Sequence, residues 1–190
     1  KTMAADGYFE QAMTLIAMIK SPDTKAMTIR GIGMELAGKV SSVEQRSIIF
    51  RMLAKEVGNI EHRASHEIAL TYIAMSQAFA GDDESSWQTA ASIENPALRN
   101  KAYAETAEIQ AERGDLSAVE KSIAFINTAS FTNKAYSITA EIFTKQGLLN
   151  EAYILANRIE NPYKKASALQ EILDYKPETD EGEDETSTMP

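Results

Sequence analysis

Residues 81–113 read GDDESSWQTAASIENPALRNKAYAETAEIQAER, and the pattern returns at 114–146 as GDLSAVEKSIAFINTASFTNKAYSITAEIFTKQ. A third copy begins at Gly147 and runs to residue 173. The opening glycines Gly81, Gly114 and Gly147 are evenly spaced, and the same interval, which we call the repeat period, separates Ile93, Ile126 and Ile159. A repeat period of about 33 residues is typical of two-helix units stacked in a row, and it argues against an enzyme core that is built only once.

Helical spacing of apolar residues extends to both sides of this stretch. We predict helices at about 7–20, 24–37, 42–57, 60–80, 83–93, 98–113, 116–127, 131–146, 149–159 and 163–175. Three helix starts carry a side chain that can cap free N–H groups, followed by a proline that tolerates the first turn: Ser21–Pro22, Asn95–Pro96 and Asn161–Pro162. Gly114 is expected to end its helix in the left-handed conformation. The predicted fold is all-α, with about five antiparallel helix pairs in one domain over residues 1–177 and an enlarged unit at 41–80.

Small residues recur at fixed steps before the turn glycines. Ala26, Ala69, Ala102 and Ala135 each lie the same number of positions before a glycine, as closely approaching helices require. A lysine directly precedes an alanine near the start of four helices, and these residues form what we call the lysine series: Lys25, Lys101, Lys134 and Lys165. Two interpretations are open. The lysines form a row of cations that meets an acidic peptide, or their stems simply cover apolar neighbours on the surface.

Composition excludes several classes of function. The 190-residue chain has 19 basic and 28 acidic residues, and residues 178–190 hold six of the acids and no basic residue. This tail is expected to be disordered because it has few apolar side chains. No cluster of Lys and Arg indicates a nucleic-acid surface, and no apolar run approaches the roughly 20 residues of a membrane span. The chain lacks cysteine and begins at Lys1, which leaves a cytoplasmic protein and one exported after processing both open.

The two histidines do not form a recognisable catalytic motif. His62 and His66 are four residues apart on a predicted helix, but Arg63 stands where a metalloprotease needs glutamate, and no third ligand is marked. We expect solvated histidines, with a metal-binding helical protein as the least favoured alternative. The sequence also contains no nucleophile elbow and no glycine-rich phosphate loop, so we predict no enzymatic activity and no cofactor.

Two further side-chain placements follow from the aligned units. Trp87, the only tryptophan, is expected to form a half-buried contact between units, because its equivalents are a mixed set. On the last helix, Leu169, Ile172 and Leu173 are expected to face inward, which would leave the opposite side polar as a terminal unit needs.

The aligned units resemble the tetratricopeptide repeat, which has a period of about 34 residues and small residues at fixed steps of each helix. The matching steps, in the order of that family, are Thr106–Ala107, Gly114–Asp115–Leu116 and Val119, then Thr139–Ala140, Gly147 and Ala152. The resemblance covers residues 7–175, and it lacks the family's early tryptophan and the tyrosine before the turn. It implies a TPR-like solenoid, a short right-handed superhelix whose concave groove binds a peptide or helix of another protein.

The resemblance also implies which residues line that groove. They are the lysine series, glutamates further along the same helices, and three residues of the enlarged unit: Lys25, Thr71, Tyr72, Met75, Lys101, Glu108, Lys134, Glu141 and Lys165. The predicted function is a non-enzymatic scaffold for another protein, as a monomer or homodimer. A structural or self-associating repeat protein is the alternative. A further hypothesis is that the acidic tail folds back on the lysine series and competes with ligand.

Overall fold

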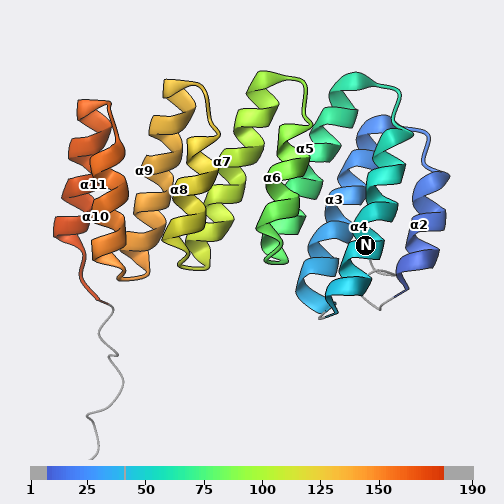
Figure 1. Cartoon of the computed structure of the whole chain (residues 1–190), viewed down its shortest axis with the longest axis horizontal. Helices are drawn as coiled ribbons and strands as arrows, with labels where there is room; N and C mark the ends of the chain where they lie inside the picture. Colours follow the sequence, from blue (N-terminus) through green and yellow to red (C-terminus); the bar gives the residue numbers. More distant parts are fainter. Residues whose placement is uncertain (1–7, 41, 178–190) are drawn as a thin grey trace, which may run out of the picture.

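The protein is all-helical in the computed structural model, which describes residues 8–40 and 42–177. Within these residues there is no strand, and the helices are α2 (Phe9–Ala17), α3 (Pro22–Lys39), α4 (Val43–Gly58), α5 (Arg63–Phe79), α6 (Asp83–Ala91), α7 (Pro96–Glu112), α8 (Leu116–Ala124), α9 (Ala129–Lys145), α10 (Leu149–Arg158) and α11 (Pro162–Asp174). Consecutive helices run in alternate directions, and the row leads from α2 at one end of the longest axis to α10 and α11 at the other (Figure 1). The predicted tail lies outside the described residues.

The helix boundaries arise from local signals that the sequence already contained. The side chains of Ser21, Asn95 and Asn161 accept hydrogen bonds from backbone N–H groups of the first turn, and a proline follows each of them. Gly81, Gly114 and Gly147 have φ angles of 78°, 75° and 75°, which a side chain would strain. The three predicted caps and the left-handed conformation of Gly114 are confirmed.

The helices form two layers, and only in one of them does each helix pack on the next helix of the same layer. The odd-numbered helices pack on one another in the order α3, α5, α7, α9 and α11. Together they form a continuous layer that we call the odd layer. The even-numbered helices α4, α6, α8 and α10 each pack on the two odd helices that flank them, while α2 packs on α3 and α4. The main inter-unit packing therefore lies in the odd layer.

Small side chains allow this close packing. Ala74, Ala107 and Ala140 follow one another at the repeat period and are completely or almost completely buried. Gly33 takes the equivalent place on α3, where an added Cβ would lie 2.4 Å from Oγ of Ser76 on α5. The buried apolar residues form two clusters, one from Ala12 to Ile73 and one from Ala74 to Ala168, which meet within α5.

The last helix differs from its prediction at one position. Leu169 and Ile172 are half-buried and pack against the second cluster, as expected. Leu173 is instead 79% exposed. It lies one repeat period after Ala140, at a step that faces the next odd helix in the earlier units, and no further helix follows α11 in the described part of the chain.

Candidate functional site

The structure corrects the register of the first and last units. In the last unit Ala168, one repeat period after Ala135, is the buried alanine, while Ala166 is exposed. In the first unit the capped prolines Pro22 and Pro96 set the register. With this alignment, buried Ile29, Ile32, Gly33 and Leu36 of α3 match buried Tyr103, Thr106, Ala107 and Gln110 of α7. Matching by alanine alone had displaced both end units by two residues.

This register defines one surface of the odd layer, which we call the odd-helix face. It consists of the residues on each odd helix at the steps of Lys101, Glu105 and Glu108: Met27, Gly31 and Met34; Ile68, Tyr72 and Met75; Lys101, Glu105 and Glu108; Lys134, Ile138 and Glu141; Ser167, Glu171 and Asp174. All of these residues are exposed or half-exposed. The odd-helix face therefore crosses every unit at the same three steps.

Hollows lie on this face at both ends of the row. A hollow of about 540 Å³ is lined by residues of α3 that include Met27, Gly31 and Met34. A second hollow of about 460 Å³ lies between α9 and α11, and its lining includes Glu141 and Glu171. The two hollows thus lie at equivalent steps of the odd helices, at opposite ends of the row.

The half of the face on α3 and α5 is mainly apolar. Met27 is about half-exposed, and its sulfur lies 3.5 Å from the hydroxyl of Tyr72 on the neighbouring helix. The guanidinium carbon of Arg30 lies 5.5 Å from the centre of the Tyr72 ring, within range of a cation–π interaction. Tyr72 and Met75 are both half-exposed here. Flexible methionine and a fixed aromatic ring suit contact with apolar side chains of varied shape.

The half of the face on α7, α9 and α11 is charged and predominantly acidic. Lys101 pairs with Glu105 of the same helix at 3.6 Å. Burial raises the pKa of Glu105, while Lys101, Arg30 and Lys134 act in the opposite direction. Burial and the neighbouring Glu105 also raise the pKa of Glu108, which Lys134 partly offsets. These carboxylates are thus held in a partly desolvated setting, where a cation from outside would stabilise their charged form.

Three further carboxylates of the face lie at the α9–α11 end: Glu141, Glu171 and Asp174. Glu141 accepts a hydrogen bond from Lys145 one turn along α9. This bond raises the pKa of Lys145, and Glu171 of α11 acts in the same direction. Lys101 and Lys145 are therefore both paired with a carboxylate of their own helix.

The structure places three residues of the predicted groove elsewhere. Lys25 is buried, and its Nζ lies 3.3 Å from Oε2 of Glu56 on α4. Thr71 is also buried and donates a hydrogen bond to the carbonyl of Glu67. Lys165 is out of register with the series, since Ser167 occupies the step of Lys101, and its Nζ donates to the carbonyl of Asn157. The lysine series therefore reduces to Lys101 and Lys134.

A second repeated feature was missed at the sequence level. Glu67, Asn100 and Asn133 recur at the repeat period near the starts of α5, α7 and α9, and we call them the linker clasp. Backbone N–H groups of the linker that leads into the next odd helix donate to each: that of Asn95 to Glu67 at 2.8 Å, that of Asn127 to Asn100 at 3.4 Å, and those of Glu160 and Asn161 to Asn133 at 2.7 and 3.0 Å. The recurrence of a polar residue at the repeat period is the signal from which the sequence could have predicted this clasp.

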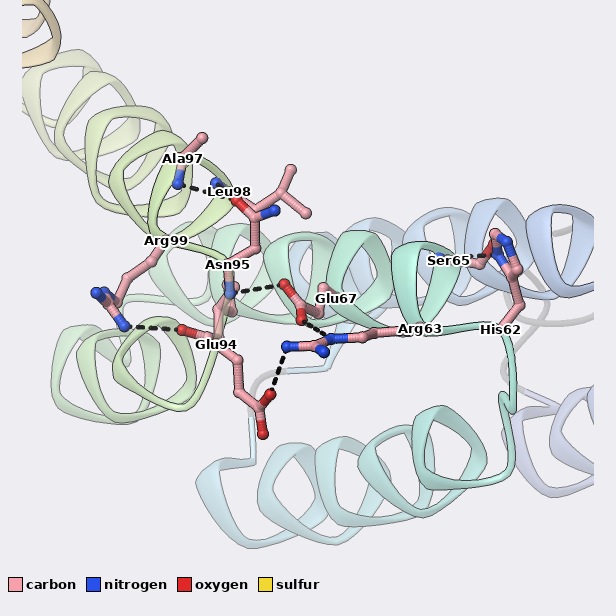
Figure 2. A network of polar contacts seen from close by, with 10 residues as sticks. His62, Arg63, Ser65, Glu67, Glu94, Asn95, Ala97, Leu98 and Arg99 are labelled. Carbon is pink, nitrogen blue, oxygen red and sulfur yellow. Dashed lines mark hydrogen bonds and ion pairs between the residues drawn. The ribbon is translucent and has the colours of Figure 1, made fainter.

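Glu67 is the charged member of the clasp. Figure 2 shows its carboxylate between the linker at Asn95 and the guanidinium of Arg63, which in turn reaches Glu94. The Arg63 nitrogens lie 3.3 Å from Glu67 and 2.8 Å from Glu94. Glu67 is almost completely buried, and these partners compensate for its desolvation. The network joins α5 to the linker before α7, and we therefore assign it to the stability of the fold and not to the candidate site.

His62 is exposed and His66 half-buried, and each ring also makes a hydrogen bond within the protein. His62 is the N-cap of α5, and its Nδ1 accepts from the backbone N–H of Ser65 at 3.4 Å. Nδ1 of His66 lies 3.0 Å from the carbonyl of Val57, so it must carry a proton and donate. The two rings therefore have separate hydrogen-bonding roles at the α4–α5 junction.

Trp87 forms the half-buried contact between units that the sequence predicted. Its Nε1 donates to the hydroxyl of Ser122 on α8 at 2.7 Å, and Ser122 donates to Oε1 of Gln110 at 2.6 Å. Nζ of Lys121 lies 3.7 Å from the centre of the Trp87 ring. The interval from Gln110 to Ser122 also separates Gln77 from Thr89, which donates to it at 2.8 Å, so this pairing of an odd and an even helix recurs.

Replacing Glu108 with glutamine is expected to stabilise the protein at neutral pH. The pKa of Glu108 is higher in the folded chain than its ordinary value of 4.5, so the folded protein binds more protons between these two values. Stability therefore falls as the pH rises through this window, and the advantage of Glu108→Gln should shrink as the pH is lowered to about 4.5. Urea denaturation of both proteins at several pH values measures this difference.

Glu44→Gln provides a control of opposite sign. Hydrogen bonds from the backbone and from Ser42 lower the pKa of Glu44, so its charged form favours folding above its unfolded pKa. Glu44→Gln should therefore destabilise the protein at neutral pH. Equal effects of the two substitutions would contradict the assignment of a desolvated Glu108.

The described residues were also searched for a membrane-spanning helix and for a metal-ion site. None of the helices in residues 8–40 and 42–177 is long and apolar enough to cross a membrane. In the same residues no three His, Asp or Glu side chains gather as a metal-ion site would require. No protein-family model matches the chain, and searches of curated proteins and of solved structures found no match either.

Proposed function

We propose that the protein is a TPR-like binding scaffold whose odd-helix face holds a segment of another protein. The observation that carries this proposal is that the two hollows, about 540 and 460 Å³, are lined at equivalent steps of the repeat. The continuous odd layer supports it, since a row of helices curves toward the side on which the helices approach most closely. Such a face would be the concave side of a superhelix.

The side chains of the face also favour binding over a purely structural role. Met27, Met34, Tyr72 and Met75 are exposed or half-exposed on adjacent helices, although each is large enough to contribute to a core. A contiguous apolar surface beside charged residues is typical of a site that contacts another molecule. In the charged half, Glu105 and Glu108 are kept in partly buried positions that cost stability at neutral pH.

Substitution of Met75 by glutamate tests the proposal. Met75 lies on α5, in the apolar half of the face and next to α7, and a charge there would oppose contact with an apolar group, so binding of native partners should fall about tenfold or more. Proteins captured from an extract of the source cells by wild-type and Met75→Glu protein would be compared by quantitative mass spectrometry. Ile154→Glu, at a 42% exposed position on α10 of the other layer, is the matched control.

Equal capture by all three proteins would contradict the proposal. Thermal denaturation of the variants separates a local effect from loss of the fold. The alternative function is self-association, and one observation favours it. A hollow of about 560 Å³ lies between α2 and α4, and its lining includes the apolar residues Tyr8, Ile48 and Met52. Light scattering on the same samples would detect self-association.

A further inference from the structure

We propose that the segment bound on the odd-helix face carries apolar side chains at one end and lysine or arginine side chains at the other. The apolar end lies on α3 and α5, and the basic end lies on α7, α9 and α11. This inference rests on the proposed function and names the chemistry of its partner. It reverses the charge expected from the lysine series.

The apolar end is set by the hollow of about 540 Å³ on α3. Met27 and Met34 line it, and Tyr72 of α5 reaches the sulfur of Met27. Three charged residues also border this hollow: Glu35 and Lys39 pair with each other at 3.9 Å, and Arg30 lies over the Tyr72 ring. An incoming cation would be repelled by Arg30, whereas an apolar side chain would be accommodated by the methionines.

The basic end is set by charge complementarity. On α7, α9 and α11 the face has five carboxylates and two lysines, and Lys101 is already paired with Glu105 at 3.6 Å. Glu108 is partly desolvated, and among the neighbours that affect its pKa two are carboxylates and one, Lys134, is a cation. Residues 1–177 hold 22 acidic and 19 basic residues, so the net charge of this part of the chain also attracts a basic segment. An acidic segment would meet the opposite field.

The geometry of the row limits the spacing within the partner. Neighbouring packed helices lie about 8–10 Å apart, so two steps of the odd layer, from α5 to α9, cover about 16–20 Å. That distance corresponds to about 5–6 residues of an extended chain or about 11–13 residues of a helix. The apolar and basic groups of the partner should be separated accordingly.

A random library of peptides of about 20 residues, displayed on phage, tests the inference without knowledge of the native partner. Selection on wild-type protein should enrich peptides that combine an apolar cluster with a Lys or Arg cluster at one of these spacings. A synthetic peptide of the enriched sequence should then bind in solution, and its affinity should fall as the salt concentration rises.

The double substitution Glu105→Gln/Glu108→Gln should lower the affinity for this peptide about tenfold. It removes two charges but keeps the shape of both side chains, and the burial of the carboxylates indicates that folding will not suffer. Glu151→Gln/Glu160→Gln makes the same change in net charge on α10 and the linker after it, and should leave the affinity unchanged.

The outcomes separate this inference from the proposed function. Enrichment of acidic peptides whose binding is lost in Met75→Glu would overturn the chemistry of the partner and leave the odd-helix face as the binding site. Equal loss of affinity in both glutamine variants would also overturn it, because the attraction would then come from net charge alone. Peptides that bind Met75→Glu as well as wild type, or no enrichment at all, would overturn both proposals.

Discussion

Substitution of Lys25 by methionine is expected to lower the free energy of unfolding by about 3–5 kcal/mol. The side chain of Lys25 is only 8% exposed, and it is the cationic partner of Glu56 at 3.3 Å. Methionine keeps most of the apolar stem but leaves the Glu56 carboxylate in a site that is largely closed to water. Its remaining hydrogen bond, from the side-chain amide of Asn59 at 3.4 Å, does not supply the missing charge. Urea denaturation followed by circular dichroism measures the loss.

The double variant Lys25→Met/Glu56→Leu is the control for this prediction. It removes both charges, and replacement of a buried ion pair by apolar side chains of similar volume is commonly neutral or stabilising. We therefore expect its stability to return to within about 1 kcal/mol of wild type. A double variant as unstable as Lys25→Met would show that packing of the lysine stem, and not an unpaired carboxylate, causes the loss.

Substitution of Phe143 by alanine is expected to cost a similar amount, about 3–5 kcal/mol, by a different mechanism. Phe143 is the largest of the completely buried side chains, and it lies on α9 within the second apolar cluster. Its equivalents in the two preceding units are Gln77 and Gln110, so this unit has an aromatic ring where the others have a hydrogen-bonded amide. Alanine would leave a cavity between α9 and α10. The midpoint of urea denaturation, followed by Trp87 fluorescence, measures the effect.

Phe125→Ala is the matched comparison. Phe125 is 44% exposed at the end of α8, where its ring centre lies 5.1 Å from that of Tyr103 and 6.1 Å from that of Trp87. Loss of these edge contacts should cost about 1 kcal/mol. Comparable losses at Phe143 and Phe125 would contradict a tightly packed core around α9.

Secondary structure could be predicted because its signals are local. The capped prolines at Pro22, Pro96 and Pro162 and the turn glycines lie within a few residues of the boundaries that they set. The all-helical fold follows from these signals and from the helical spacing of apolar residues. An aromatic contact such as that of Trp87 could also be anticipated, because its register was known.

The residues of the odd-helix face could be predicted only where the register was correct. Lys101, Glu108, Lys134 and Glu141 belong to the regular units, and all four lie on the odd-helix face. In the end units, alignment on alanine selected Lys25 and Lys165 in place of Met27 and Ser167, which alignment on the prolines would have given. The burial of Lys25 depends on Glu56, which is 31 residues away on another helix. The spacing of residues within one helix cannot reveal such a distant partner.

The linker clasp has a consequence for how the chain can change its length. Each of three linkers is held by one clasp residue, at position 67, 100 or 133, and the linker lies 27 or 28 residues after that residue. Suppose that one repeat period is deleted or duplicated directly after a clasp residue. The next linker then still has a clasp residue 27 or 28 positions before it, because the clasp residues recur at the repeat period. Evolution could shorten or lengthen the row by whole units, and so alter the length of the odd-helix face, while each linker keeps an equivalent clasp residue.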